Sequence, residues 1–222
     1  MQNVIKDLER LYRKYDLDYD GIQYANRCAR KNMNIKPPKR AKKLPVLLSE
    51  DELRSFMARV MDQADLSKML IYDLMLYSGL RVSEVLNIKV EDVYPKEGKI
   101  LIRQAKGSKD RYILYPDSVR FKMEMILKTA KEYLFRNPQT NNPITARTVE
   151  NWCKSLAKQA GITKNVHPHL FRHHFATNAK THGMSDETVA LLMGHSNVQS
   201  TKTYTHLTLE TIRGEYNKAL RG

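Results

Sequence analysis

Apolar residues recur every three or four positions along most of this 222-residue chain, and this spacing predicts a mainly helical protein. Two short helices are expected at the N-terminus, and one more is expected to start at Arg81, in the run L-R-V-S-E-V-L. The other expected helices follow residue 49, where S-E-D-E forms a capping box. The expected ranges are 4–15, 20–32, 50–61, 67–79, 117–135, 146–160, 168–182, 186–193 and 207–220.

Two short stretches alternate in the manner of β-strands instead, over residues 99–104 and 111–114. The sequence A-K-G-S-K-D lies between them and predicts a glycine-containing turn. Lys106 and Lys109 would then stand at or near the tip of a hairpin. The expected fold class is mainly α with a small antiparallel β-hairpin or sheet.

The chain is expected to contain three parts. Residues 1–35 are too short for a core of their own, residues 36–46 read as a linker, and residues 47–222 form the main domain. The linker carries K-P-P-K-R-A-K-K, whose paired prolines favour an extended backbone. Its basic residues are candidates to lie along a phosphate backbone, with a merely solvated linker as the alternative. They are Lys36, Lys39, Arg40, Lys42 and Lys43.

A net charge of +14 favours a polyanionic partner, usually nucleic acid, over a basic enzyme that binds none. The expected helix 146–160 has an apolar stripe and an opposite face that carries Arg147, Asn151, Lys154 and Lys158. That face would suit docking on DNA, although a solvated basic face is as good an explanation.

Other classes of protein find little support in the composition. No run of residues is long and apolar enough to span a membrane, and the N-terminus lacks an apolar signal region. Cys28 and Cys153 make neither a disulfide framework nor a metal site, so both are expected to be packing residues. A reducing, cytoplasmic setting is expected.

The stretch from His167 to Tyr204 contains many groups that can bind a phosphate, transfer a proton or act as a nucleophile. His169 and Arg172 are three residues apart, so on a helix they share one face. His195 follows a glycine at an expected helix end, and Tyr204 follows in a polar run without apolar neighbours. By contrast, Tyr72 and Tyr77 sit among apolar residues and are expected in the core, as is the ring of Phe171.

These groups, with Arg81 and Lys106, make a metal-free phosphoryl-transfer set. Two guanidinium groups grip phosphate oxygens in a fork geometry and stabilise charge on pentacoordinate phosphorus. They also favour the phenolate of a tyrosine nucleophile, while a histidine takes its proton and a lysine protonates the leaving oxygen. No carboxylate cluster for magnesium is evident, so no metal and no cofactor are expected.

The ordered motifs G-L-R-V-S-E, H-L-F-R-H-H-F-A-T and M-G-H-S-N, with a tyrosine nine residues after the last histidine, resemble the tyrosine recombinase (phage integrase) family over residues 47–220. The resemblance implies that family's catalytic fold and a site-specific recombinase that cleaves and rejoins double-stranded DNA through a 3′-phosphotyrosine. It implies a phosphate clamp of Arg81 and Arg172, supported by Glu84, with Tyr204 as nucleophile. The implied proton donor is Lys106, with Lys109 the weaker candidate, while His169 handles protons and His195 bonds the phosphate.

The resemblance also implies how the chain would assemble. Family members usually act as tetramers that pass a C-terminal segment to a neighbour, sometimes with accessory DNA-bending proteins, on nucleoid DNA. Residues 207–220 would serve as that segment or pack against their own chain. Residues 1–35 resemble the last helices of the N-terminal core-binding domain that full-length members carry. This short N-terminal part fits either a fragment or a naturally short member such as the fimbrial invertases. His174 stands where the family has a small Ser or Thr, and it is expected only to pack.

Three other functions compete with recombination. A type IB topoisomerase cleaves DNA with the same kinds of residues, namely tyrosine, arginine, lysine and histidine, but it relaxes DNA as a monomer. A DNA-binding module without catalysis is the second, although it would have to keep the complete set. The third is a zinc protein, for which the chain offers no matched ligand spacing. Its ligands would be His167, His169, His173 and His174.

Overall fold

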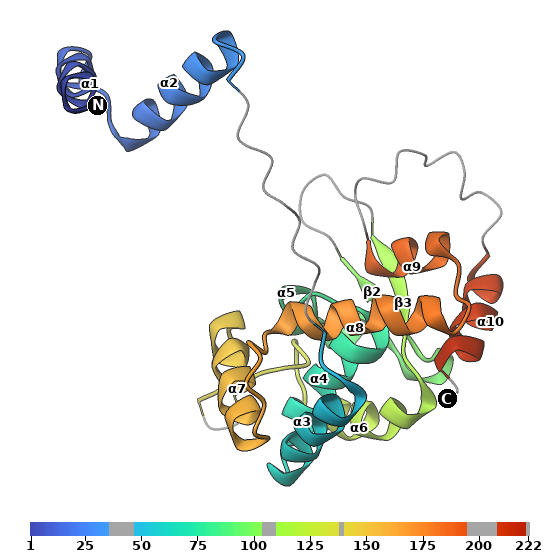
Figure 1. Ribbon diagram of the computed structural model, residues 1–222. Helices are drawn as coiled ribbons and strands as arrows, with labels where there is room; N and C mark the ends of the chain where they lie inside the picture. The colour runs from blue at the N-terminus through green and yellow to red at the C-terminus, as the bar shows by residue number, and fades with distance from the viewer. Residues whose placement is uncertain (36–46, 104–109, 138–139, 195–207, 221–222) are drawn as a thin grey trace. The chain divides into compact units, whose positions relative to one another are not determined.

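The computed structural model describes residues 1–35, 47–103, 110–137, 140–194 and 208–220 (Figure 1). Its contacts divide the chain into two compact units, Met1–Leu44 and Pro45–Gly222. No helix in these ranges is long and apolar enough to cross a membrane.

The first unit consists of two helices, α1 (Gln2–Lys14) and α2 (Tyr19–Asn32), close to the expected ranges. Asp18 caps α2 by accepting a hydrogen bond from the Gly21 backbone N–H at 2.8 Å. The Tyr12 hydroxyl donates to Asn26 Oδ1 at 2.9 Å and links the two helices. Neither helix buries a side chain within this unit.

The second unit contains the other helices and a small sheet, and most helix bounds agree with the sequence prediction. The capping box is present, since the Ser49 N–H donates to Glu52 Oε2 and Ser49 Oγ accepts from the Glu52 N–H. The α-helices are α3 (Glu50–Asp62), α4 (Leu66–Ser78), α5 (Val82–Leu86), α6 (Asp117–Leu127), α7 (Ala146–Gln159), α8 (Pro168–Thr181), α9 (Asp186–Met193) and α10 (Leu209–Leu220).

Helix α4 is the centre of the core, because every residue from Leu70 to Leu76 is buried. Helix α8 packs along it (Figure 1). Three aromatic rings from α3, α4 and α8 meet here, with centroids 5.1–5.3 Å apart: Phe56, Tyr72 and Phe171. Tyr72 is fully buried beside Cys153, and Tyr77 is partly buried against the same core, so the expectation of structural tyrosines is confirmed.

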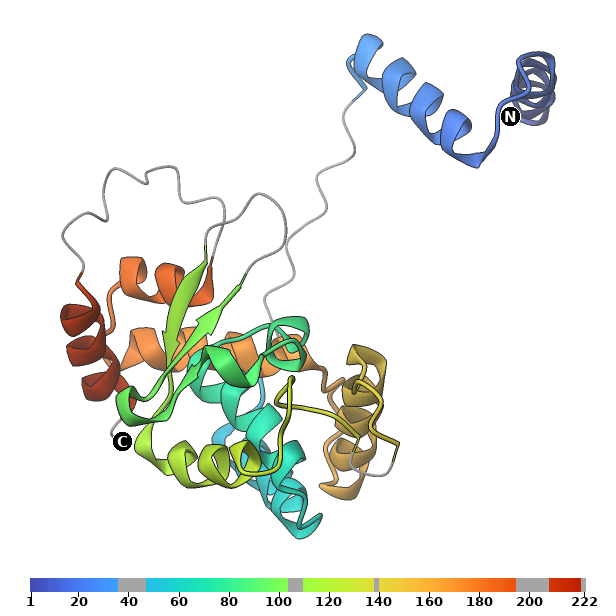
Figure 2. The same cartoon turned by 180° about the vertical axis from the view of Figure 1, so that it is seen from behind.

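The sheet has three antiparallel strands in the order β1-β2-β3, one more than the expected hairpin. They are β1 (Val93–Tyr94), β2 (Lys99–Ile102) and β3 (Arg111–Leu114). Ile100 pairs with Ile113, and both side chains are fully buried. Figure 2 shows the sheet from behind, where β3 packs against α9. The mainly α class with a small antiparallel sheet is confirmed.

The prediction of one helix to residue 135 was wrong, since α6 ends at Leu127. At about 100° per residue, Phe135 would lie on the face opposite Ile126, so one helix could not bury both. The chain instead runs alongside residues 88–90. Leu134 N–H donates to the Ile88 carbonyl at 2.9 Å, and Val90 N–H donates to the Glu132 carbonyl at 3.0 Å. This path buries both Leu134 and Phe135.

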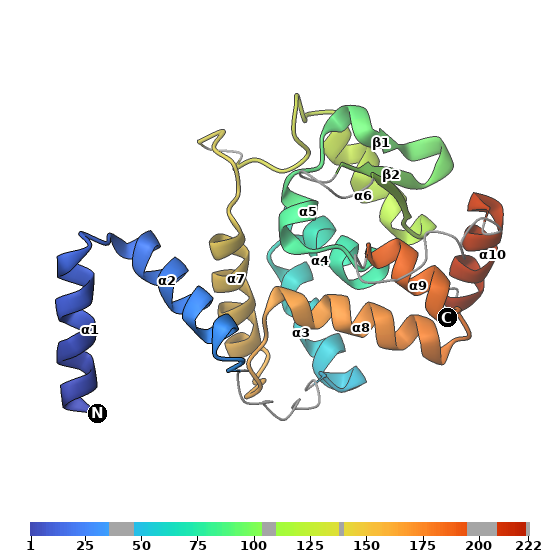
Figure 3. The ribbon, with the colours of Figure 1, turned by 90° about the horizontal axis from the view of Figure 1, so that it is seen from above.

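Helix α10 packs against its own chain, beside one end of α8 (Figure 3). Tyr216 is 1% exposed, and its hydroxyl donates to the Tyr77 carbonyl at 2.8 Å. Glu215 Oε2 accepts from both the N–H and the hydroxyl of Ser185, at 3.0 and 2.9 Å. Helix α10 is thus held to its own chain by contacts with Tyr77 and Ser185.

Candidate active site

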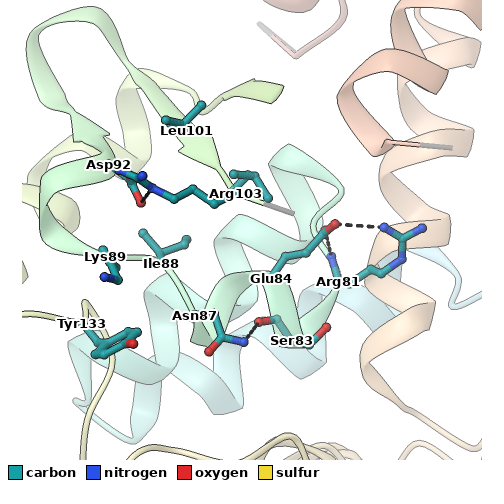
Figure 4. Close-up of a pocket in the computed structure, with 11 residues that line it drawn as sticks. Arg81, Ser83, Glu84, Asn87, Ile88, Lys89, Asp92, Leu101, Arg103 and Tyr133 are labelled. Atoms are coloured by element: carbon teal, nitrogen blue, oxygen red, sulfur yellow. Dashed lines mark hydrogen bonds and ion pairs between the residues drawn. The ribbon is translucent and has the colours of Figure 1, made fainter. Parts of the chain in front are cut away.

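Arg81 and Glu84 meet at the start of α5, where Arg81 is the N-cap residue. The Arg81 N–H donates to Glu84 Oε2 at 2.8 Å, and the Arg81 guanidinium Nη1 donates to Oε1 at 2.9 Å (Figure 4). The carboxylate thus satisfies a free N–H of the helix end and also orients the arginine side chain. Arg81 keeps 38% of its side chain exposed, so it remains available to a ligand.

Arg172 lies on α8, inside the core, with 5% of the residue exposed. Its Nη1 donates to the carbonyl of Gly79, and its Nη2 donates to the carbonyl of Met193 at 2.7 Å. These carbonyls end α4 and α9, where a helix leaves its last carbonyls without partners. Arg172 Nη1 also lies 3.8 Å from Glu84 Oε2, which joins it to the Arg81 pair.

A third arginine, Arg111 at the start of β3, completes the network and was missed as a site residue in the sequence. Its Nη2 donates to Glu84 Oε2 at 3.0 Å, and its Nε donates to the Leu192 carbonyl at 2.8 Å. The sequence did hold a signal for it. Arg111 alternates with Tyr112 and Ile113 along the strand, so it shares the face of the buried Ile113. An arginine on a core-facing strand position needs a partner.

Burial and the neighbouring groups of this network shift the pKa values of Glu84 and Arg172. Burial raises the pKa of the Glu84 carboxyl, but hydrogen bonds from Arg111 and from the Arg81 N–H, with the charges of both arginines, bring it below its usual value. Burial and the charges of Arg81 and Arg111 lower the pKa of Arg172 to about 10. At neutral pH Arg172 therefore remains a cation and Glu84 a carboxylate.

The histidines of α8 divide into two kinds. His169 is exposed at the first turn, with its ring 6.4 Å from that of His167. Burial, followed by the charges of His169 and His173, lowers the pKa of His167. His174 is half-buried, and its Nε2 accepts a hydrogen bond from the Leu48 N–H at 3.1 Å. This contact agrees with the purely structural part expected of His174.

An open pocket of about 500 Å³ lies beside Arg81 and Glu84 (Figure 4). Asp92, Arg103 and Tyr133 line its other side. Arg103 donates to both carboxylate oxygens of the buried Asp92, at 2.7–2.9 Å, so its charge is largely paired. Arg81 and Glu84 are the two members of the arginine network among the residues that line this hollow.

The structure brings together Arg81, Glu84 and Arg172, with His169 on the same helix as Arg172. The remaining predicted catalytic residues, Lys106, His195 and Tyr204, lie outside the described residues. So do some of the predicted DNA contacts, namely Lys36, Lys39, Arg40, Lys42, Lys43 and Lys109. Gly194, the residue before His195, is described and ends α9 with φ at +63°.

The predicted basic face of α7 is present. Val149, Cys153, Leu156 and Ala157 are buried on the opposite face. The residues expected to contact DNA are all exposed: Arg147, Asn151, Lys154 and Lys158.

The fold is that of tyrosine recombinase catalytic domains, as comparison with known proteins shows. The sequence matches the phage integrase family over residues 47–211. The chain belongs to that family, and the resemblance seen in its motifs is confirmed. It is 33% identical over 193 residues to a tyrosine recombinase of Thermosipho africanus, covering 86% of this chain and 66% of the relative.

Two further relatives extend this result. Tyrosine recombinase XerA of Pyrococcus horikoshii is 36% identical over 191 residues, covering 83% of this chain and 65% of the relative. A crystal structure of a XerA recombinase superimposes with a TM-score of 0.64 at 30% identity, covering 96% of this chain and 82% of that one. The chain thus spans slightly less than two thirds of the length of the two curated relatives.

Replacing Gly79 with alanine should destabilise the protein, because the carbonyl that holds Arg172 lies at a crowded left-handed turn. Gly79 has φ at +63°, and an added Cβ would lie 2.3 Å from the buried Phe175 ring. The left-handed backbone costs about 1–2 kcal/mol for alanine, and overpacking adds about 1–3 kcal/mol. Urea unfolding should therefore show a loss of about 2–5 kcal/mol.

Gly161→Ala is the matched control for this prediction. Gly161 also has a positive φ, at +70°, but an added Cβ would meet nothing within 4 Å. It should lose only the backbone contribution of about 1–2 kcal/mol. Equal losses in the two variants would contradict the clash with Phe175.

Proposed function

We propose that this protein is a site-specific DNA recombinase that cleaves and rejoins DNA through a 3′-phosphotyrosine intermediate. The observation that carries the proposal is the fixed pairing of Arg81 and Arg172 around Glu84. The two arginines come from different helices, yet one carboxylate lies within 4 Å of both guanidinium groups. Such preorganised cations stabilise the charge that builds on a phosphate in the transition state.

The proposed chemistry balances without a metal or ATP. The Tyr204 oxygen attacks the scissile phosphorus, forms the P–O bond to tyrosine and releases the 5′ oxygen of the broken phosphodiester. His169 takes part in moving the tyrosine proton, and Lys106 gives a proton to the leaving 5′ oxygen. His195 donates to the phosphate. A 5′-hydroxyl from a partner strand then attacks the phosphotyrosine and reverses each transfer, because the covalent bond conserves the phosphodiester energy.

The proposed substrate is double-stranded DNA, and the proposed working form is a homotetramer on two duplexes, with accessory DNA-bending proteins where a site requires them. Residues 47–222 would supply catalysis. Residues 1–35 and the basic stretch 36–46 would add contacts to the DNA backbone. Nucleoid DNA in the cytoplasm is the proposed location.

Covalent capture tests this function directly. The protein is mixed, in chelator, with a pool of randomised duplexes carrying nicks, then denatured, and the DNA that stays attached is sequenced. A nick lets the released strand diffuse away, so that the adduct accumulates. Adducts enriched for one sequence motif are expected. Adducts without sequence preference would favour a relaxing enzyme of the topoisomerase IB kind, and no adduct at all would contradict strand cleavage.

The exposed basic face of α7 should contribute to a salt-dependent affinity for DNA. Every phosphate that the protein no longer neutralises makes the slope of log affinity against log salt shallower by about 0.9. Changing Arg147, Lys154 and Lys158 together to Gln should therefore reduce the slope by about 2–3, measured by fluorescence anisotropy on one duplex.

The control for the salt experiment removes the same charge elsewhere. Lys96, Lys128 and Lys131 lie outside α7, and the variant in which all three become Gln has the same net charge. An equal reduction of slope in both variants would mean that total charge, rather than α7, governs binding.

A further inference from the structure

Arg111 connects parts of the catalytic set that come from distant stretches of the chain. It starts β3, directly after the segment that carries Lys106 and Lys109. Its Nη2 reaches Glu84 at 3.0 Å, and Glu84 in turn holds Arg81 at 2.9 Å. Its side chain is 9% exposed, so solvent does not compete for these contacts.

The same guanidinium group also fixes the end of α9. Arg111 Nε donates to the Leu192 carbonyl at 2.8 Å. A Cβ added to Gly194 would lie 2.8 Å from both Cζ and Nη1 of Arg111, so Gly194 packs directly over the guanidinium group. Arg111 therefore abuts the residue that immediately precedes His195.

We propose that Arg111 is a positioning residue of the cleavage reaction, which holds Glu84, and through it Arg81, in the geometry that binds the scissile phosphate. This inference rests on the proposed function. It also explains why residue 194 is a glycine, because any side chain there would displace the guanidinium group of Arg111.

Arginine suits this place better than lysine does. The planar guanidinium group donates to the carboxylate and to the carbonyl from different nitrogen atoms at the same time. A lysine ammonium is a single point donor on a flexible stem, and it would satisfy one contact at the expense of the other. Arg111→Lys thus keeps the charge and removes the bridge.

The positioning by Arg111 should affect the titration of Glu84. Among the described residues, the charged side chains within 4 Å of its carboxylate are Arg81, Arg111 and Arg172. Burial raises the Glu84 pKa, and the hydrogen bond from Arg111 is the largest influence that lowers it. Removing Arg111 should therefore raise that pKa. The carboxylate would then be protonated at a higher pH, and the acid limb of the cleavage rate should move to higher pH.

The first experiment uses the full chain without DNA. Glutamate carboxyl carbons are labelled with ¹³C, the Glu84 resonance is assigned from its absence in Glu84→Gln, and it is titrated by NMR. Arg111→Gln should move the Glu84 midpoint to higher pH. Arg120→Gln is the matched control, because Arg120 also binds one carboxylate, Asp117, and the carbonyl of Pro95, away from Glu84. An unchanged midpoint in Arg111→Gln would overturn the proposal.

The second experiment measures single-turnover cleavage of a nicked duplex chosen by covalent capture. Arg111→Lys should cleave about 10–100-fold more slowly, the usual effect of losing a group that orients a catalytic residue. Its affinity for intact duplex should change by less than about threefold, because most of that affinity comes from phosphate contacts elsewhere. Arg120→Lys should cleave at the wild-type rate. Cleavage by Arg111→Lys at the wild-type rate would overturn the proposal.

A double-mutant cycle separates positioning from general destabilisation. In a Glu84→Gln background, Arg111→Lys should slow cleavage by less than about threefold further, since the residue through which it acts is already changed. Fully multiplicative effects would overturn the route through Glu84. If wild-type protein forms no adduct while Arg111→Gln still shifts the Glu84 titration, the proposed function fails but the positioning contact stands.

Discussion

Tyr204→Phe is expected to abolish covalent attachment to DNA while leaving DNA binding nearly unchanged. The substitution removes only the phenolic oxygen, which is the proposed nucleophile, and phenylalanine has no group that can form a bond to phosphorus. Because affinity for DNA comes mainly from cationic contacts with the phosphate backbone, the loss of one hydroxyl should change it little. Denaturing gels of the captured nicked duplex measure the adduct, and gel shifts measure binding.

Tyr112→Phe is the matched control, since it removes one phenolic oxygen from a tyrosine that is 37% exposed on β3. Tyr112 packs 6.0 Å from Tyr94, with Lys99 over its ring, and those contacts need the ring rather than the hydroxyl. This variant should form adducts at the wild-type rate. Undiminished adducts in Tyr204→Phe would show that another residue attacks.

Arg172→Lys is expected to slow DNA cleavage by about 10²–10³-fold, the range found when one preorganised donor to a developing charge is lost. Arg172 uses two nitrogen atoms to bind the carbonyls of Gly79 and Met193. These contacts fix the guanidinium plane, so that its remaining N–H groups can face a phosphate. A lysine in the same buried space would bind one carbonyl and present no second, fixed donor.

Single-turnover cleavage on the captured duplex measures this effect, and urea unfolding shows whether the variant stays folded. Arg213→Lys is the control, because Arg213 also donates to a carbonyl, that of Glu97, but lies on α10 outside the network. It should cleave at the wild-type rate. A loss of less than about tenfold in Arg172→Lys, well below the range for a preorganised donor, would remove this arginine from the proposed phosphate clamp.

The sequence predicted the fold well where one helix face is apolar and the ends carry caps. The bounds 186–193 were correct because Ser185 and Gly194 mark both ends, by a side-chain cap and a left-handed turn. The sequence misled at residues 128–135, which lack glycine and proline and so looked helical. There the conformation is determined by hydrogen bonds to residues 88–90, which are distant in the sequence. A local sequence pattern cannot indicate such a long-range partner.

In the site, too, local features could be predicted from the sequence and long-range contacts could not. Arg81 and Glu84 could be paired from their spacing at a helix start, because both members belong to one turn. Arg172 could be recognised from its motif, but its burial and its carbonyl partners could not. The role of Arg111 was missed because it depends on contacts with Glu84 and Leu192, which lie 27 and 81 positions away in the chain.

The acceptors that orient Arg172 and Arg111 include three main-chain carbonyls, those of Gly79, Leu192 and Met193. Every amino acid supplies this atom, so point mutations at positions 192 and 193 cannot delete the acceptor and act only through packing. The arginines are thereby shielded from sequence drift in the helix that holds them. The same arrangement makes the site vulnerable to insertions and deletions in α9, which would shift the helix end and carry the carbonyls away.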